Sequence, residues 1–197
     1  MRKVIVNEFL SLDGVAQAPG GAEEDTDGGF AHGGWHMQYT GDELAQRWVL
    51  ANIVEAGGYL LGRRTYDIFA AYWPNADEDQ RVIAEPLNTK PKYVASRKLT
   101  GPLDWQNSTA LEGDLEQAVA ALKEQDGGDL STIGSTELVR SLLEHDLVDE
   151  LRLTIDPVVL GGGKRIFRDD GRLRKLRLVD AQVAGTGTIL ATYARGD

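Results

Sequence analysis

Two short apolar runs, each ending in a glycine-marked turn that leads into a helix-like segment, most constrain what this chain can fold into. Residues 59–61 lead into the turn Gly62-Arg63-Arg64-Thr65, and residues 130–133 lead into Gly134-Ser135-Thr136-Glu137. A buried strand that turns directly into a helix is the building unit of a sheet covered by helices. The pattern therefore predicts an α/β fold, in which two such turns at neighbouring strand ends could hold one nucleotide.

The residues of both turns suit the binding of phosphate. The free amides and the positive dipole end of a helix N-terminus attract anions, and Arg63 and Arg64 add two cationic side chains. We interpret Thr65 as the N-cap of the first helix, and Ser135 and Thr136 as hydroxyl groups at the start of the second. An ordinary strand-to-helix connection is the alternative for each turn taken alone.

Strand-like and helix-like segments alternate until the last quarter of the chain, which is mostly strand-like. Strands are predicted at residues 4–10, 59–61, 93–96, 108–111, 130–133, 151–155, 176–183 and 187–193. Helices are predicted after Asp42, Thr65, Asp114 and Thr136. The last two strands flank Gly185-Thr186 and alternate well enough to form an antiparallel hairpin. This order predicts a mostly parallel sheet with an antiparallel end.

Composition limits the classes of protein to which the chain can belong. Its 197 residues, 42% of them hydrophobic, suit a single domain over residues 1–197. The net charge of −10 argues against binding to nucleic acid or to an anionic membrane, because either partner calls for a basic face. The chain has no cysteine and no apolar run of the roughly 20 residues that span a membrane. We therefore expect a cytoplasmic protein whose partner is a small molecule.

Residues 19–41 form a long stretch that is rich in glycine and acidic side chains and also contains aromatic residues. A loop of this length inside a compact domain is usually functional or disordered, and the aromatic residues favour a lid. His32 and His36 have the i, i+4 spacing of a metal pair on a helix. Because the surrounding glycines disfavour a helix, we expect no metal site.

Four motifs relate the chain to a known family. They are Ser11-Leu12-Asp13-Gly14 with residues 15–21, Leu61-Gly62-Arg63-Arg64-Thr65-Tyr66, Gly134-Ser135-Thr136, and the stretch from Val148-Asp149-Glu150-Leu151-Arg152-Leu153 to Gly161-Gly162-Gly163. On these motifs the chain resembles the dihydrofolate reductase-like family, and within it single-domain proteins similar to the C-terminal reductase domain of the bifunctional riboflavin-biosynthesis deaminase/reductase. The resemblance implies a three-layer α/β fold with a central, mostly parallel sheet, an antiparallel C-terminal hairpin and helices on both faces.

The resemblance also implies that the cofactor is NADPH. The residues implied to lie against the nicotinamide are Val15, Ala16 and Gln17. Those implied to hold the phosphates from one side are Gly62, Arg63, Arg64 and Thr65. Those implied to wrap the pyrophosphate are Gly134, Ser135, Thr136 and Glu137. Those implied for the 2′-phosphate are Ser96, Arg97 and Lys98. The alternative for the arginine and lysine side chains is a solvated surface charge.

Candidates for the substrate side lie near the first strand and the helix after Asp42. Asp13 is the implied catalytic residue, as a substrate-binding or proton-relaying carboxylate, and its alternative role is to close the bend at Gly14. The substrate-binding candidates are Trp35, Asp42, Gln46 and Gly162. Asp42 also suits a helix N-cap. The glycine triplet that contains Gly162 lacks the spacing of a phosphate loop, and a flexible turn is its alternative.

Together these expectations describe an NADPH-dependent reductase that transfers a hydride to a carbonyl or imine of a small pyrimidine- or pterin-like substrate, without metal or flavin. The chain lacks the zinc-binding motif of a deaminase. The acidic side chains of residues 19–41 would repel a phosphorylated sugar. The alternative is a catalytically silent nucleotide-binding or interaction protein with the same fold, and a flavin-binding reductase is a third hypothesis. By analogy with the family, we expect a homodimer.

Overall fold

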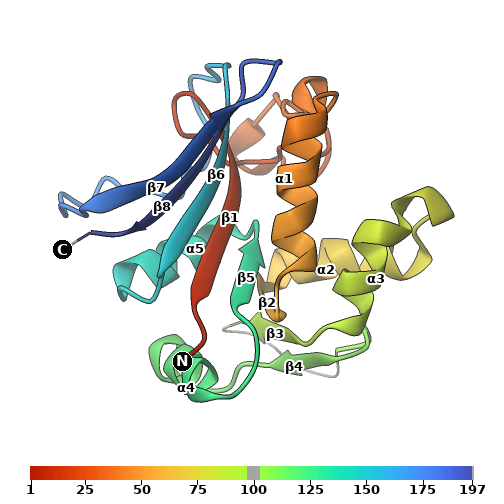
Figure 1. Cartoon of the computed structure of the whole chain (residues 1–197), viewed down its shortest axis with the longest axis vertical. Coiled ribbons are helices and arrows are strands. Elements are labelled where there is room, and N and C mark those ends of the chain that lie inside the picture. The colour runs from red at the N-terminus through yellow and green to blue at the C-terminus, as the bar shows by residue number, and fades with distance from the viewer. Residues whose placement is uncertain (97–102, 197) are drawn as a thin grey trace.

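The computed structural model describes residues 1–96 and 103–196, and all of the described strands lie in one eight-stranded sheet (Figure 1). The strands are β1 (Val4–Ser11), β2 (Gly58–Gly62), β3 (Lys92–Ala95), β4 (Ser108–Ala110), β5 (Leu130–Ile133), β6 (Glu150–Asp156), β7 (Leu176–Val183) and β8 (Ile189–Arg195). Their order across the sheet is β4-β3-β2-β5-β1-β6-β8-β7. The first strand of the chain is therefore an inner strand, with β5 and β6 on either side.

Most neighbouring strands run parallel. The pairs β1–β5, β1–β6, β2–β3, β2–β5 and β3–β4 are parallel, whereas β8 is antiparallel to both β6 and β7. In Figure 1, β7 and β8 form one end of the sheet, where the C-terminus also lies. The predicted α/β sheet, mostly parallel with an antiparallel C-terminal hairpin, is confirmed.

Five α-helices occur among the described residues. They are α1 (Glu43–Val54), α2 (Arg63–Tyr72), α3 (Arg81–Thr89), α4 (Leu115–Glu124) and α5 (Thr136–Glu144). Short 3-10 turns occur at Asp27–Gly29, Met37–Tyr39, Trp73–Asn75 and Glu78–Gln80. None of the helices in residues 1–96 and 103–196 is long and apolar enough to cross a membrane.

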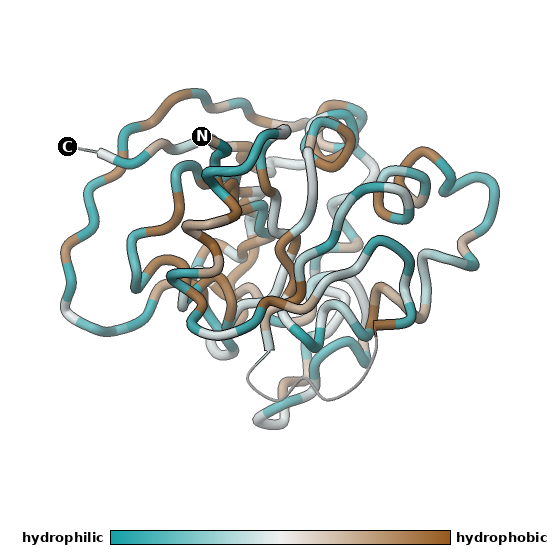
Figure 2. The backbone as a smooth tube through the Cα atoms, turned by 90° about the horizontal axis from the view of Figure 1, so that it is seen from below, coloured by the Kyte–Doolittle hydropathy of each residue, from teal (hydrophilic) through white to brown (hydrophobic). Residues whose placement is uncertain are grey.

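Two hydrophobic clusters show which helices cover each face of the sheet. The cluster on the face covered by α4 and α5 includes Val6, Leu60, Leu130, Val119 and Leu142. The cluster on the face covered by α1 and α3 includes Tyr59, Leu61, Ile53 and Leu87. Successive residues of β2 alternate between the clusters, as the pleat of a strand requires. Figure 2 shows the result, with hydrophobic segments gathered towards the middle of the molecule.

The structure confirms two predicted helix starts and corrects one. The carboxylates of Asp42 and Asp114 accept hydrogen bonds from amides in the first turns of α1 and α4, as N-caps do. In contrast, α2 begins at Arg63 with Gly62 at the N-cap position, so Thr65 lies inside the first turn. β2 therefore ends at Gly62 and α2 begins at the next residue, with no loop between them.

The sequence pattern does not predict α3, because Pro86 lies inside it. Proline removes one helical hydrogen bond and usually bends or breaks a helix. In α3 the burial of Ala84 and Leu87 against the sheet offsets this loss.

Candidate functional site

A cleft of about 700 Å³ opens at the carboxyl ends of β2 and β5 and over the middle of β1. Its walls come from α1, α2, the start of α5 and the loop that follows β1. Ligands of parallel α/β sheets bind at this edge because the strand-to-helix turns and the helix N-termini meet there. The cleft is therefore the candidate active site.

The two glycine turns are bonded to each other at the edge of this cleft. The Gly62 amide donates to Ser135 Oγ over 2.8 Å, and Ser135 Oγ donates to Thr65 Oγ1 over 2.6 Å. A Cβ atom at Gly62 would lie only 2.7 Å from Ser135 Oγ. Only glycine fits here, so the sequence signal at Gly62 reflects a close approach between the turns.

Both helices that start at these turns lack a side-chain cap. Neither Gly62, the N-cap of α2, nor Ser135, the N-cap of α5, forms a side-chain hydrogen bond to its helix. Ser135 follows Gly134, and both have left-handed backbones with φ of 69° and 71°. Uncapped first-turn amides are free to bind an anion, and the helix dipoles add positive potential. Two such N-termini at one cleft suit a ligand with two linked phosphates.

The loop after β1 is held in place by Gln17, which is almost completely buried. Its Nε2 donates to the carbonyl oxygens of Asp25 and Asp27, each over 3.0 Å. Its Oε1 accepts from the amide of Lys164, also over 3.0 Å. Its own carbonyl oxygen accepts from the indole nitrogen of Trp35 over 2.8 Å. The described path of this loop is therefore fixed by hydrogen bonds to one residue.

Two carboxylates of this loop bind the cations of the cleft. Asp25 and Asp27 both pair with Arg64, at 3.0 and 2.6 Å, and with Lys164, at 2.6 and 2.7 Å. The hydrogen bonds from Lys164 and Arg64 lower the pKa of Asp27. These ion pairs weaken the repulsion that Asp25 and Asp27 would exert on an anionic substrate, and the expected repulsion by the acidic residues of 19–41 as a whole stays a prediction. Glu23 and Glu24 also line the cleft.

Most residues predicted for the cofactor line the cleft. They are Ala16, Gln17, Gly62, Arg63, Arg64, Thr65, Gly134, Ser135, Thr136 and Glu137. The predicted residues that do not line it are Asp13, Val15, Trp35, Asp42, Gln46, Ser96 and Gly162. Arg97 and Lys98 lie outside the described residues. Ser96 directly follows β3, so it lies at the same edge of the sheet as both glycine turns.

Asp13 fastens the turn after β1 to the loop after β6. Its carboxylate accepts from Ser11 Oγ over 2.7 Å and from the amides of Leu160 and Gly161 over 3.0 Å. Partial burial opposes ionisation, but these hydrogen bonds outweigh it and lower the pKa of Asp13 to about 2. Asp13 therefore has a structural role, which is to anchor this turn to the loop after β6 rather than only to close the bend at Gly14, and its catalytic role stays a prediction.

The substrate-binding candidates also have structural contacts. Asp42 caps α1 and accepts from the Gly185 amide over 2.7 Å. Gln46 donates to the Thr40 carbonyl over 2.6 Å. Trp35 is buried beneath the loop, with its indole bonded to Gln17. Gly162 is exposed and has open space around it. None of these four lines the described cleft.

The α1 residues that line the cleft are Trp48, Val49, Asn52 and Ile53. The helical spacing of Trp48 also serves the core, because Trp48 packs against the cluster of Ala45, Ala184 and Leu190. The signal that could have found the site is a second stripe, in which Trp48 and Asn52 lie four residues apart on one helix face. The position of α1 relative to the sheet could not be derived from that spacing.

Two amide side chains of the cleft keep one unpaired group each. Asn7 Nδ2 donates to Ser131 Oγ over 2.7 Å, and Asn52 Oδ1 accepts from Arg152 over 2.6 Å. Among the described residues, Asn7 Oδ1 and Asn52 Nδ2 are buried without a hydrogen-bond partner. The cleft therefore offers one free acceptor and one free donor, and leaving them unpaired is costly.

Glu8 is a buried carboxyl group that sequence reasoning missed. It is only 4% exposed, lies in β1 and lines the cleft, and its Oε1 has no partner among the described residues. Burial, with a smaller contribution from the charge of Glu24, raises the pKa of Glu8 to about 8. The group is therefore mostly neutral at pH 7. A Glu in an alternating strand gives no sign of such burial.

Comparison with known sequences decides the family. The sequence profile of the RibD C-terminal domain matches residues 2–190. The chain belongs to the RibD C-terminal domain family. YyaP of Bacillus subtilis, described as uncharacterized, is 30% identical over 198 residues, which cover 98% of this chain and 94% of that protein.

Solved structures show that this family member has the expected dihydrofolate reductase-like fold. A putative riboflavin biosynthesis protein from Shewanella sp. PV-4 has a TM-score of 0.70 and 21% identity, with 99% of each chain covered. A dihydrofolate reductase from Enterococcus faecalis, complexed with NADP(H), has a TM-score of 0.63 and 14% identity, with 99% of this chain and 97% of that chain covered. At these identities the likeness establishes the fold.

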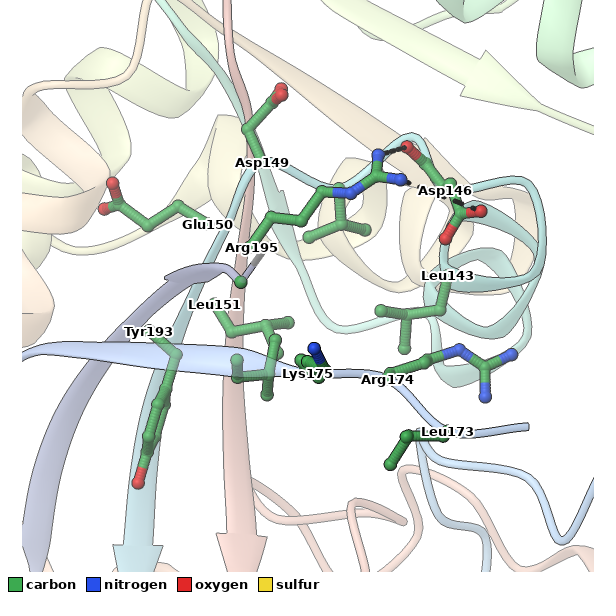
Figure 3. A pocket seen from close by; sticks show the side chains of 13 residues that line it. Leu143, Asp146, Asp149, Glu150, Leu151, Leu173, Arg174, Lys175, Tyr193 and Arg195 are labelled. Carbon is green, nitrogen blue, oxygen red and sulfur yellow. Dashed lines mark hydrogen bonds and ion pairs between the residues drawn. The ribbon is translucent and has the colours of Figure 1, made fainter. Parts of the chain in front are cut away.

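A second hollow of this RibD C-terminal domain family member, about 360 Å³ in volume, lies between the end of α5 and strands β6 to β8 (Figure 3). Several of its charged side chains are already paired. Arg195 reaches towards Asp146 and donates to its carbonyl over 3.1 Å, and Asp149 accepts from Lys123 over 2.6 Å and from the Val4 amide over 2.8 Å. The Asp149 motif thus ties β1 to β6. Within residues 1–96 and 103–196, no cluster of three or more side chains could hold a metal ion.

Replacing Glu8 should change how stability depends on pH. Because the pKa of Glu8 is about 8 in the folded chain and 4.5 ordinarily, the unfolded chain loses a proton between these values that the folded chain keeps. Wild-type stability therefore falls as the pH rises through this window, and Glu8→Gln should remove that fall. In urea unfolding from pH 5 to 9, the free energy of unfolding of the variant should rise relative to that of wild type, by on the order of a few kcal/mol at pH 8.

Glu124→Gln is the matched control for this measurement, since Glu124 is exposed on α4. Its stability should differ from wild type by a constant amount across the pH range. If Glu8→Gln behaves in the same way, Glu8 is not a buried neutral acid.

Asp13→Asn should destabilise the fold by about 1–3 kcal/mol, because it weakens hydrogen bonds to a charged acceptor. The folded pKa of Asp13 lies below its ordinary value, so the charge-dependent part of the loss is present above pH 3.8 and disappears as the pH falls towards 2. Urea unfolding at pH 7 and pH 2.5 checks this, with the exposed Asp126→Asn as control. Unchanged stability together with lost turnover would instead support the catalytic role.

Proposed function

We propose that this chain is an NADPH-dependent reductase that transfers a hydride to a carbonyl or imine of a small pyrimidine- or pterin-like heterocycle. The observation that carries the proposal is the pair of uncapped helix N-termini, α2 and α5, joined through Ser135 at one cleft. Membership of the RibD C-terminal domain family supports it. The NADP(H) bound by the Enterococcus dihydrofolate reductase, which has the same fold, supports the choice of cofactor.

The residues of the cleft fit a dinucleotide. The first-turn amides of α2 and α5 would hold the pyrophosphate, and Gly62 and Gly134 would let it approach the backbone. Ala16 and Gln17 line the cleft and would lie against the nicotinamide, whereas Val15 is buried and does not line it. Bound there, the nicotinamide cofactor supplies the hydride.

We assign the 2′-phosphate to the group formed by Ser96, Arg97 and Lys98. Ser96 follows β3, which is the neighbour of β2 in the sheet. Arg97 and Lys98 follow Ser96 in the sequence, and a hydroxyl group with two cations would recognise a phosphate and favour NADPH over NADH.

The other half of the cleft suits a flat heterocycle. Trp48 and Ile53 of α1 and Phe9 of β1 give apolar walls, and the unpaired Asn7 Oδ1 and Asn52 Nδ2 give one acceptor and one donor. A ring edge that presents an N–H beside a C=O would satisfy both groups. Pyrimidines and pterins carry such edges, and a ring without them would leave two buried polar groups unpaired.

The homodimer remains part of the proposal. β7 lies at the end of the sheet, and each of its residues is exposed, including Leu178, Val179 and Val183. A long, partly apolar edge strand is typically covered by another chain, because its unpaired backbone and side chains favour pairing.

Binding of NADPH should depend on the fit between the two glycine turns. Wild type should bind NADPH with micromolar affinity, and more tightly than NADH, in a titration of tryptophan fluorescence. Gly62→Ala should weaken binding at least about tenfold, because the new Cβ would force Ser135 away and separate the helix N-termini. Gly162→Ala, which meets open space, should bind as wild type does.

Turnover then tests the reaction itself. NADPH oxidation should be observed with a panel of pyrimidine and pterin compounds that carry a C=N or C=O bond, beginning with 7,8-dihydrofolate. A wild-type protein that binds neither NADPH nor NADH would end the reductase proposal, and one that binds NADPH without turnover of any compound would support the silent nucleotide-binding protein.

Asp27→Asn should strengthen NADPH binding about two- to fivefold at low salt. The variant leaves Arg64 with fewer competing carboxylate oxygens, and the gain is small because an exposed ion pair of this kind is weak. The same fluorescence titration measures the effect, which should shrink at high salt. Asp77→Asn makes the same change of charge at an exposed position away from the cleft, so equal gains in both variants would contradict a specific competition for Arg64.

A further inference from the structure

A histidine and an aspartate from distant parts of the chain form a buried pair beside the cleft. His36 Nδ1 lies 2.7 Å from Asp156 Oδ2. Asp156 is completely buried, and its other oxygen accepts from the hydroxyl of Thr188 over 2.7 Å. A carboxylate in this setting only accepts hydrogen bonds, so the proton of the neutral imidazole lies on Nδ1.

The other ring nitrogen of His36 is free. Nε2 makes no hydrogen bond within residues 1–96 and 103–196, and it is not among the polar atoms there that are buried without a partner. His36 is 9% exposed and lines the cleft. Nε2 is therefore the atom that this side chain presents to a bound ligand.

Ring contacts fix the plane of this imidazole. The ring centroid of Phe9 lies 4.1 Å away, and that of Trp35 lies 6.2 Å away in an edge-on arrangement. Together with the bond to Asp156, these contacts hold the ring without a contribution from substrate, which is the condition for efficient proton transfer.

His36 lies in the half of the cleft assigned above to the heterocycle. Asn7 and Phe9 alternate with Glu8 along β1, so they point to the opposite face of the sheet. Thr154 of β6 is the register partner of Phe9 and lines the same half. The ring of His36 packs on Phe9, and it therefore lies beside the groups that would bind the substrate ring.

We propose that His36 is the proton donor of the reduction, an assignment that rests on the function proposed above. In the reaction the acceptor carbon gains a hydride, with its electron pair, from the cofactor. The electron pair of the C=N or C=O bond moves onto its nitrogen or oxygen atom, and that atom takes the proton from Nε2 of the protonated imidazole. The neutral ring keeps its proton on Nδ1, and solvent returns one proton to Nε2.

Asp156 is a positioning residue in this scheme. It holds the Nδ1–H tautomer, so that Nε2 is the nitrogen that exchanges protons with the ligand, and its charge stabilises the protonated ring. Glu8 is the alternative proton donor, because it is a protonated acid that lines the cleft. However, it shares its face of β1 with Val6 and Leu10, which pack beneath α5. It therefore lies across the sheet from the apolar walls that suit the heterocycle.

The tautomer can be measured without substrate. In ¹⁵N-histidine NMR spectra at basic pH, where the ring is neutral, His36 should show a protonated Nδ1 and an unprotonated Nε2. The variant His36→Gln assigns the signal among the three histidines. Asp156→Asn should shift the ring towards the Nε2–H tautomer, because an amide can donate to Nδ1. An Nε2–H tautomer in wild type would overturn the assignment.

Kinetics with a substrate from the turnover panel give the second measurement. His36→Gln should lower kcat by about 10²- to 10⁴-fold, while the NADPH dissociation constant stays within about twofold of wild type. His32→Gln is the matched control, because His32 is an exposed residue of the same loop that does not line the cleft. It should keep wild-type kcat.

The outcomes separate this assignment from the reductase proposal. If wild type oxidises NADPH and His36→Gln does so equally well, His36 is not the donor and the reductase remains. If Glu8→Gln loses turnover and His36→Gln keeps it, the donor is Glu8. If wild type does not bind or oxidise NADPH, the reductase fails and the proton transfer with it, whatever tautomer the ring adopts. NADPH binding that is retained by His36→Gln shows that the variant has folded.

Discussion

The hydroxyl of Ser135 is the contact on which the geometry of the cleft depends. It accepts from the Gly62 amide and donates to Thr65, so it is not available to cap α5. To reach this place Ser135 adopts a left-handed backbone, which costs a residue other than glycine roughly 1–2 kcal/mol. Gly62 has no side chain with which to cap α2. One close contact between two turns therefore leaves both helix N-termini uncapped and fixes their separation, which are the properties that a site for linked phosphates requires.

The loop after β1 adds a second, electrostatic constraint. Its carboxylates at Asp25 and Asp27 bind Arg64 of α2 and Lys164 of the segment after β6, so three distant segments are held together at one edge of the cleft. An anion that binds Arg64 must compete with Asp27 for the same guanidinium group. Binding of an anion at Arg64 would therefore be linked to the position of the loop, because it would replace an existing ion pair. An acidic protein can in this way keep cations in its cleft without leaving them unpaired.

Local signals in the sequence were sufficient for much of this structure, and long-range pairing explains what they missed. Strand positions and the N-caps at Asp42 and Asp114 follow from neighbouring residues, so they could be predicted. The burial of Glu8 depends on packing beneath α5 and on the loop above it, and an alternating strand gives no sign of either. His36 bonds to a residue 120 positions later, and the carboxylate of Asp13 binds amides almost 150 positions away. Motif resemblance identified two turns that line one cleft, because both are local structures, and their binding of phosphate stays a prediction. It could not identify which side chains of α1 face the cleft, since that depends on how the helix packs.

The middle of β1 carries buried polar groups that lower the stability of the fold. An inner strand of a parallel sheet is covered on both faces and is normally apolar. Here Asn7 and Glu8 are consecutive, each has a buried oxygen without a partner, and Asn52 adds an unpaired nitrogen from α1. Each such group costs about 1–3 kcal/mol if it stays unpaired, and apolar residues of similar size would avoid that cost. These residues therefore do not stabilise the fold. A ligand that paired with Asn7 and Asn52 would recover part of this free energy on binding, so their unpaired groups would favour a ring with complementary polar atoms.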